Sequence, residues 1–250
     1  MANSLLDDVV EVPRRTMTLF FVIDTSGSMK GSKIGSVNDA IVNVLPMLDD
    51  ISSSNPDAEI RVAALEFSSG TKWLYDEPKL ASDFKWQDVE AGGLTSLGEA
   101  CVELNNKLSR SGFMKTASGS FAPAIILLSD GGPTDDYDSG LNKLKSNNWF
   151  KAAIKIAIAI GEGADLAVLE RFTGTNEAII EVKEDYPEAL KQIIRLAAVT
   201  SSQIGSKSST AGEQTKQEQV IQEIKEATKE IDGASSADAP DSSDTNYDDW

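Results

Sequence analysis

Residues 20–29 read Phe-Phe-Val-Ile-Asp-Thr-Ser-Gly-Ser-Met, and this stretch decides the fold and the candidate site of the chain. The apolar run over residues 17–23 predicts a buried strand that ends directly in the pattern Asp-x-Ser-x-Ser. In α/β proteins, ligand sites lie at the carboxyl ends of the strands. Asp24, Ser26 and Ser28 therefore place one carboxylate and two hydroxyls in a tight turn, an oxygen-only set suited to a hard cation.

Two later segments supply further oxygen atoms. Thr95 follows a pair of glycines and opens a predicted helix, and Asp130 follows an apolar run over residues 125–128 and precedes two more glycines. The chain contains no His, so the usual ligand sets for Zn²⁺ and Cu²⁺ are hard to build. The expected ion is therefore Mg²⁺ or Mn²⁺.

These three segments, in this order, resemble the von Willebrand factor A (VWA) domain and its metal-ion-dependent adhesion site. The resemblance covers about residues 15–200. It implies that a single divalent ion is held by five residues from three loops, which here are Asp24, Ser26, Ser28, Thr95 and Asp130. Two carboxylates balance a divalent ion, so the site is approximately neutral and an Asp or Glu of a partner protein can take an open coordination position.

A closer resemblance lies in the two later segments. Residues 93–100, Gly-Leu-Thr-Ser-Leu-Gly-Glu-Ala, and residues 127–136, Leu-Leu-Ser-Asp-Gly-Gly-Pro-Thr-Asp-Asp, are similar to bacterial TerY-type VWA proteins. Those proteins belong to tellurite-resistance and stress gene clusters. The resemblance implies a cytoplasmic scaffold or regulator without catalysis of its own, and a protein kinase and a PP2C-type phosphatase as partners.

Alternating strand and helix patterns predict an α/β fold with a doubly wound, mostly parallel sheet covered by helices on both faces, which is the Rossmann-like architecture of the VWA family. Strands are expected at 17–23, 59–67, 72–75, 122–128, 152–160 and 179–182, the last as an edge strand. Helices are expected at 36–48, 96–109, 139–146, 165–172 and 187–199, the last closing the domain.

Composition excludes several function classes. The chain has 23 basic and 40 acidic residues, a net charge of −17, and no evident basic patch, so nucleic-acid binding is disfavoured. The single cysteine, Cys101, fits a reducing compartment and reads as a small core residue. Neither a signal peptide nor an apolar run of membrane-spanning length is visible, so a cytoplasmic protein without membrane insertion is expected.

The composition changes near residue 200 and divides the chain into an extension (1–14), the VWA domain (15–200) and an acidic tail (201–250). In the tail, Val220, Ile224, Ala227 and Ile231 recur at helical spacing and predict an amphipathic helix over residues 213–232. Residues 233–250 carry five acids and no base, and they are expected to be disordered. Their acidic, aromatic end could instead serve as a short docking peptide.

Four charged residues lie near the predicted site. Lys30 and Lys33 could contact an acidic partner or could be solvated, and Asp135 or Asp136 could cap the helix that begins near Ser139. A haloacid-dehalogenase-type phosphatase would need an acid at the position of Ser26, and a P-loop would need a Gly at the position of Ser32. A serine hydrolase would need a His as its base, and the chain contains none. A Ser-Lys hydrolase remains a remote alternative. The main alternative function is a metal-dependent phosphohydrolase.

Overall fold

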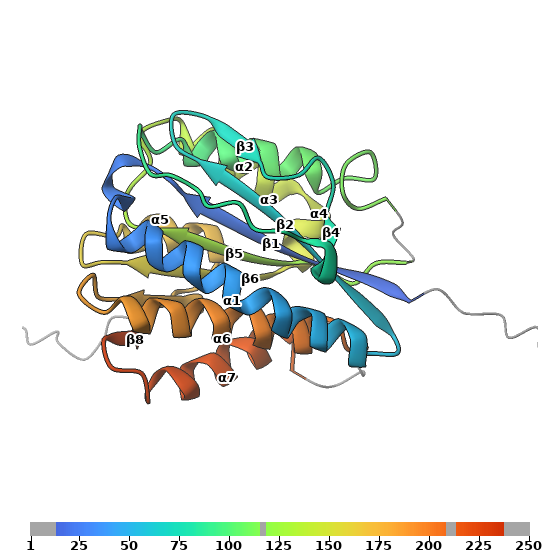
Figure 1. Cartoon of the computed structure of the whole chain (residues 1–250). Coiled ribbons are helices and arrows are strands. Elements are labelled where there is room, and N and C mark those ends of the chain that lie inside the picture. The colour runs from blue at the N-terminus through green and yellow to red at the C-terminus, as the bar shows by residue number, and fades with distance from the viewer. Residues whose placement is uncertain (1–13, 116–118, 209–213, 238–250) are drawn as a thin grey trace, which may run out of the picture.

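The computed structural model describes residues 14–115, 119–208 and 214–237, and it shows a twisted sheet between two layers of helices (Figure 1). The strands of this described part are β1 (Arg15–Asp24), β2 (Ala58–Phe67), β3 (Thr71–Trp73), β4 (Lys79–Leu80), β5 (Ala124–Ser129), β6 (Ile154–Ile160), β7 (Ile179–Val182) and β8 (Ala234–Ser236). The sheet order is β3-β2-β1-β5-β6-β7-β8, with β4 also paired to β2.

The central strands β2, β1, β5, β6 and β7 run parallel, whereas β3, β4 and β8 pair antiparallel. The predicted doubly wound α/β fold is confirmed. The predicted strand at 72–75 is present as β3, an edge strand that pairs antiparallel with β2. Parallel pairing sends the carboxyl ends of β1 and β5 to the same edge of the sheet, and this arrangement positions the candidate site.

Helices cover both faces of the sheet, because strand β1 alternates between two apolar cores. Leu19 and Phe21 lie in one core and Phe20 and Val22 in the other. The first core is closed by α1 (Ser32–Ser54), α6 (Pro187–Gly205) and α7 (Lys216–Thr228), and the second by α2 (Leu97–Lys107), α3 (Tyr137–Ser146), α4 (Asn148–Ala152) and α5 (Leu166–Thr173). Short 3₁₀ turns occur at Gly27–Met29, Ala81–Asp83 and Asn176–Ala178.

Two glycines allow a close crossing between α2 and α3. A Cβ atom at Gly140 would lie 2.1 Å from the carbonyl oxygen of Gly98, so only glycine fits there. This crossing holds the loop that precedes α3 against the start of α2. None of the helices among the described residues is long and apolar enough to cross a membrane.

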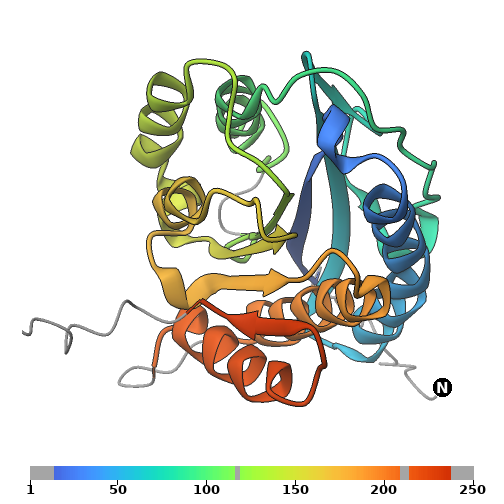
Figure 2. The ribbon, with the colours of Figure 1, turned by 90° about the vertical axis from the view of Figure 1, so that its left-hand side faces the viewer.

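The chain beyond residue 200 departs most from the expectations. Helix α6 continues to Gly205, and α7 lies within the predicted helical range and packs along α6 with Val220 and Ile224 buried (Figure 2). Helix α6 thus ends six residues beyond the predicted helix at 187–199, and the helix expected over residues 213–232 is present as α7. The N-terminus of α7 is closed by a capping box between Thr215 and Glu218, a signal that is present in the sequence.

Strand β8 shows that two further expectations were wrong. Residues Ala234–Ser236 pair antiparallel with β7, so β7 lies inside the sheet and is not its edge. The expected disorder after Gly233 is wrong for residues 234–237, and residues 238–250 lie outside the described part of the chain. A short polar strand forms here because the open edge of β7 offers it backbone hydrogen bonds. The division of the chain at residue 200 stays a prediction from composition.

Candidate metal site

The Asp-x-Ser-x-Ser turn leaves β1 at the carboxyl edge of the sheet. Asp24 is fully buried, and its Oδ1 accepts a hydrogen bond from the backbone N–H of Ser26 at 2.8 Å. The hydroxyl oxygens of Ser26 and Ser28 lie 3.0 Å apart. Ser28 is the exposed member of the turn, so the row of oxygens runs from the core to the surface.

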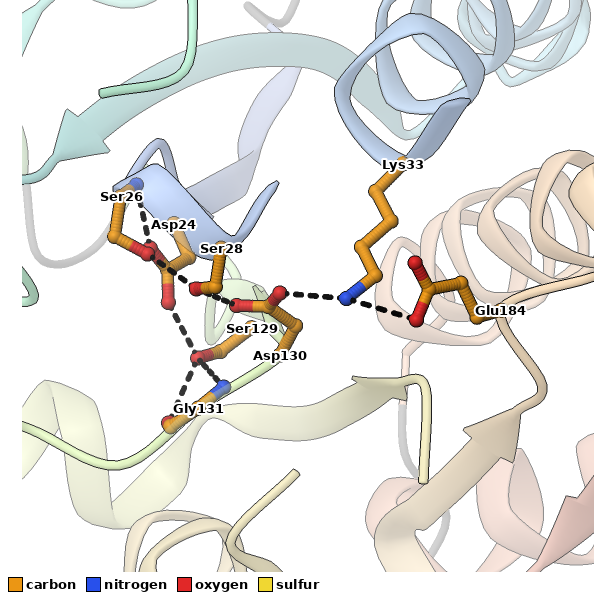
Figure 3. Close-up of polar contacts among 8 residues, drawn as sticks. All are labelled: Asp24, Ser26, Ser28, Lys33, Ser129, Asp130, Gly131 and Glu184. Carbon is orange, nitrogen blue, oxygen red and sulfur yellow. Dashed lines mark hydrogen bonds and ion pairs between the residues drawn. The ribbon is translucent and has the colours of Figure 1, made fainter. Parts of the chain in front are cut away.

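Strand β5 delivers Asp130 to the same place. The hydroxyl of Ser28 donates to Asp130 Oδ1 at 2.6 Å (Figure 3). The residue before it, Ser129, donates to Asp24 Oδ2 at 2.7 Å. Four of the five predicted ligands, from two strands more than a hundred residues apart in the chain, are therefore joined in one hydrogen-bonded chain, in which the backbone N–H of Ser26 makes the link to Asp24.

The loop that carries Thr95 is tied to both other loops by backbone contacts. The N–H of Gly27 donates to Gly93 O at 3.1 Å, and the N–H of Thr134 donates to Thr95 O at 2.9 Å. Gly93 has a φ of 85°, in the left-handed region, and a Cβ atom there would meet the Ser69 hydroxyl at 2.5 Å. Thr95 is buried in this loop, and its hydroxyl does not take part in the hydrogen-bonded chain.

Lys33 lies at this site, which neither interpretation of its sequence position anticipated. Its ammonium donates to Asp130 Oδ2 at 2.9 Å and lies 3.4 Å from Glu184 Oε2, and its side chain is only 11% exposed (Figure 3). Lys33 is therefore neither solvated nor open to a partner's acid. Lys30, by contrast, is exposed. The contact needs the start of α1 to face the β5 loop, and the sequence carries no signal of that orientation.

Electrostatics favour a cation near Asp24. Burial raises the pKa of the Asp24 carboxyl, hydrogen bonds from Ser129 and Ser26 oppose that rise, and the nearby Asp130 adds to it. The carboxylates of Asp24 and Asp130 thus lie close together in a buried site, with the hydroxyl oxygens of Ser26 and Ser28 beside them. Among the described residues no cluster of three His, Cys, Asp or Glu could hold a metal, so an ion here would depend on the hydroxyls.

The two acids after Pro133 serve as helix caps. Asp136 is the N-cap of α3 and accepts from the N–H of Ser139 at 3.1 Å. Asp135 instead caps α2, accepting from the N–H groups of Gly98 and Glu99 at 2.9 and 2.8 Å. The expected capping role is confirmed for Asp136. Asp135 serves a helix that precedes it in the chain, and this joins the Asp130 loop to the Thr95 loop.

Comparison with known proteins identifies the family and the fold. The sequence model of the von Willebrand factor type A domain matches residues 18–196, which is well over half of the chain. The chain belongs to the von Willebrand factor type A domain family. No curated protein matches the chain.

Several solved structures share the fold of this VWA protein. A von Willebrand factor type A protein from Catenulispora acidiphila has a TM-score of 0.55 and 17% identity, over 75% of this chain and 43% of that one. The ArnB paralog VWA2 from Sulfolobus acidocaldarius has a TM-score of 0.52 and 21% identity, over 72% and 44%. Proximal thread matrix protein 1 from the mussel byssus, with a zinc-occupied MIDAS motif, has a TM-score of 0.55 and 16% identity, over 76% and 48%.

The VWA protein described here spans less than half the length of each of these three chains. At such low identities the likeness concerns the fold alone. The buried thiol of Cys101 agrees with its expected place in the core, and burial raises its pKa well above the ordinary range.

Proposed function

We propose that this VWA domain is a protein-interaction module that binds a partner carboxylate through a divalent cation, Mg²⁺ or Mn²⁺. The observation that carries the proposal is the hydrogen-bonded series that brings the carboxylates of Asp24 and Asp130 together with the hydroxyls of Ser26 and Ser28. Oxygen-only sets of this kind suit hard cations. Thr95, on the loop tied to both others, would be the fifth ligand.

Charge balance at the site allows an acidic partner. Two carboxylates would balance one divalent ion, but Lys33 adds a positive charge against Asp130, and its second partner, Glu184, is 60% exposed. With Glu184 counted, a divalent cation bound here would leave the site approximately neutral, so a partner carboxylate could take an open position on the ion. The bound ion would polarise that carboxylate and fix its position, and the exposed Ser28 marks the side from which a partner could approach.

The biological setting is proposed from sequence resemblance alone. The similarity of residues 93–100 and 127–136 to TerY-type proteins makes a protein kinase and a PP2C-type phosphatase of a cytoplasmic stress-response system the first partners to test. Zinc in the mussel protein supports a divalent ion in this fold, and the absence of His in this chain favours Mg²⁺ or Mn²⁺ here.

Metal binding is tested by thermal denaturation with EDTA and with excess Mg²⁺. Preferential binding to the folded state should add about 2.7 kcal/mol to the free energy of unfolding at a hundredfold excess over Kd. Replacing Ser26 and Ser28 by Ala should abolish this gain. The matched control replaces Ser53 and Ser82, which are exposed and remote from the turn, and should keep the gain. An equal response of both variants would refute the proposed site.

Partner binding is tested by pull-down with each candidate protein. Complex formation should be lost with EDTA and with Asp24→Ala, and it should be lost when a single Asp or Glu of the partner is neutralised. A complex that survives all three changes would refute metal-bridged recognition. Mg²⁺-dependent hydrolysis of a phosphate ester that Asp24→Ala abolishes would instead support the phosphohydrolase alternative.

A further inference from the structure

A cavity of about 750 Å³ lies at the opposite edge of the sheet, where β1 and β6 begin. Among the described residues that line it, four are basic, namely Arg15, Lys151, Lys155 and Lys216, and none is acidic. This is unexpected in a chain with a net charge of −17. The residues come from β1, α4, β6 and α7, so only the fold brings these positive charges together.

The four cations of this basic cavity form no ion pair with any carboxylate in the described part of the chain. Three of them bond instead to carbonyl oxygens: Arg15 donates to Ser120 O at 2.9 Å, Lys155 to Ala153 O at 2.9 Å, and Lys216 to Gly205 O at 2.7 Å. Such contacts complete helix and strand ends. These contacts do not use every N–H donor of the basic side chains, and the Nε of Arg15 is buried without a hydrogen-bond partner.

Holding these charges together has a cost. The Arg15 guanidinium and the Lys216 ammonium lie 3.8 and 4.8 Å from the centre of the Phe121 ring, which brings both charges close to the same side chain. Burial, together with Arg15, lowers the pKa of Lys216 to about 8, and burial also lowers the pKa of Lys155. An anion in the cavity would offset both the repulsion and the desolvation.

We propose that the Asp-rich segment 238–250 of the same chain binds in this basic cavity. Strand β8 runs antiparallel to β7, so it carries the chain toward the edge where β6 begins. The N–H of Ala237 bonds to Ile179 O, and Ile179 is in register with Ala157, two residues after Lys155. The segment therefore leaves the sheet at the edge that holds the cavity.

Charge, length and tethering all favour this occupant. Residues 238–250 contain five Asp and neither Lys nor Arg. Thirteen residues can span roughly 43 Å when extended, whereas β6 and β8 are separated by only two strand spacings, about 10 Å. A free anion is repelled by the net negative charge of the protein, whereas a tethered segment acts at an effective concentration in the millimolar range.

The test is zero-length carbodiimide cross-linking of the full chain at low salt, followed by peptide mass spectrometry. We expect amide links from the segment's Asp residues to Lys151 or Lys216 within one molecule. Links to Lys143 and Lys145, exposed lysines of α3 outside the cavity, should stay at background. Replacing Lys155 and Lys216 by Gln should remove the links to Lys151, whereas Lys143→Gln with Lys145→Gln should leave them unchanged.

A second variant guards against a folding defect in the cavity variants. Replacing the five Asp of the segment by Asn leaves the described domain untouched and should let the cavity bind added pyrophosphate more tightly than the wild-type chain does. Links distributed equally over all exposed lysines, or found only in covalent dimers, would overturn the proposal. Binding of pyrophosphate to the wild-type chain as tightly as to the Asn variant would overturn it as well, since the cavity would then be open in the full chain.

Discussion

Replacing Lys33 by Met should tighten metal binding. The Lys33 ammonium lies 2.9 Å from Asp130 Oδ2, while Oδ1 of the same carboxylate faces Ser28 and the rest of the proposed ligand set. The ammonium and a bound ion therefore compete for one carboxylate. A single and a double positive charge about 5 Å apart repel by about 7 kcal/mol at an effective dielectric constant of 20, and by about 1.7 kcal/mol in water.

We therefore expect the Kd for Mg²⁺ of Lys33→Met to fall at least about tenfold, which is about 1.4 kcal/mol. The same substitution should destabilise the metal-free protein by about 1–3 kcal/mol, because the side chain of Asp130 is fully buried and loses its charged donor. Metal should consequently raise the melting temperature of the variant more than that of the wild type.

Isothermal titration calorimetry gives the affinity, and thermal denaturation in EDTA gives the metal-free stability. The matched control is Lys30→Met, which removes an exposed charge next to the same turn and should change the Kd little. Glu184→Gln should act in the opposite direction, because it leaves the Lys33 ammonium to Asp130 alone. An unchanged or weaker affinity in Lys33→Met would refute competition and show that Lys33 chiefly orients Asp130.

Three further predictions concern the fold. Gly140→Ala should cost about 1–3 kcal/mol of unfolding free energy in urea denaturation, because the new Cβ meets Gly98 O, whereas Gly163→Ala, with open space around it, should be near neutral. Ile224→Ala should cost about 2–5 kcal/mol, because this α7 side chain is buried in the core; a negligible loss would show that α7 does not contribute to the folded domain. The unfolding free energy should fall as pH rises above 9, because the Cys101 thiol ionises with its ordinary pKa of 9.0 in the unfolded chain but stays neutral in the folded protein. Cys101→Ala should reduce the fall in unfolding free energy with pH that is measured by urea denaturation.

The sequence alone determined the fold class and most of the candidate site. Apolar runs with local periodicity predicted the main strands and helices, because burial in a two-sided sheet acts on each segment by itself. The polar residues at the ends of these runs could be placed by their position after a predicted strand. Asp24 and Asp130 could therefore be expected at one edge of the sheet, since each directly follows a strand of the parallel set.

Only the tertiary structure decided contacts that depend on register and on the packing of distant elements. Ser129 bonds to Asp24 because β1 and β5 pair in the register that places Ile23 beside Leu128. Lys33 bonds to Asp130 because the first turn of α1 faces the loop that follows β5. The short polar strand β8 has no strand pattern of its own. It forms because β7 presents unpaired backbone groups, and a sequence read segment by segment does not show which edges remain open.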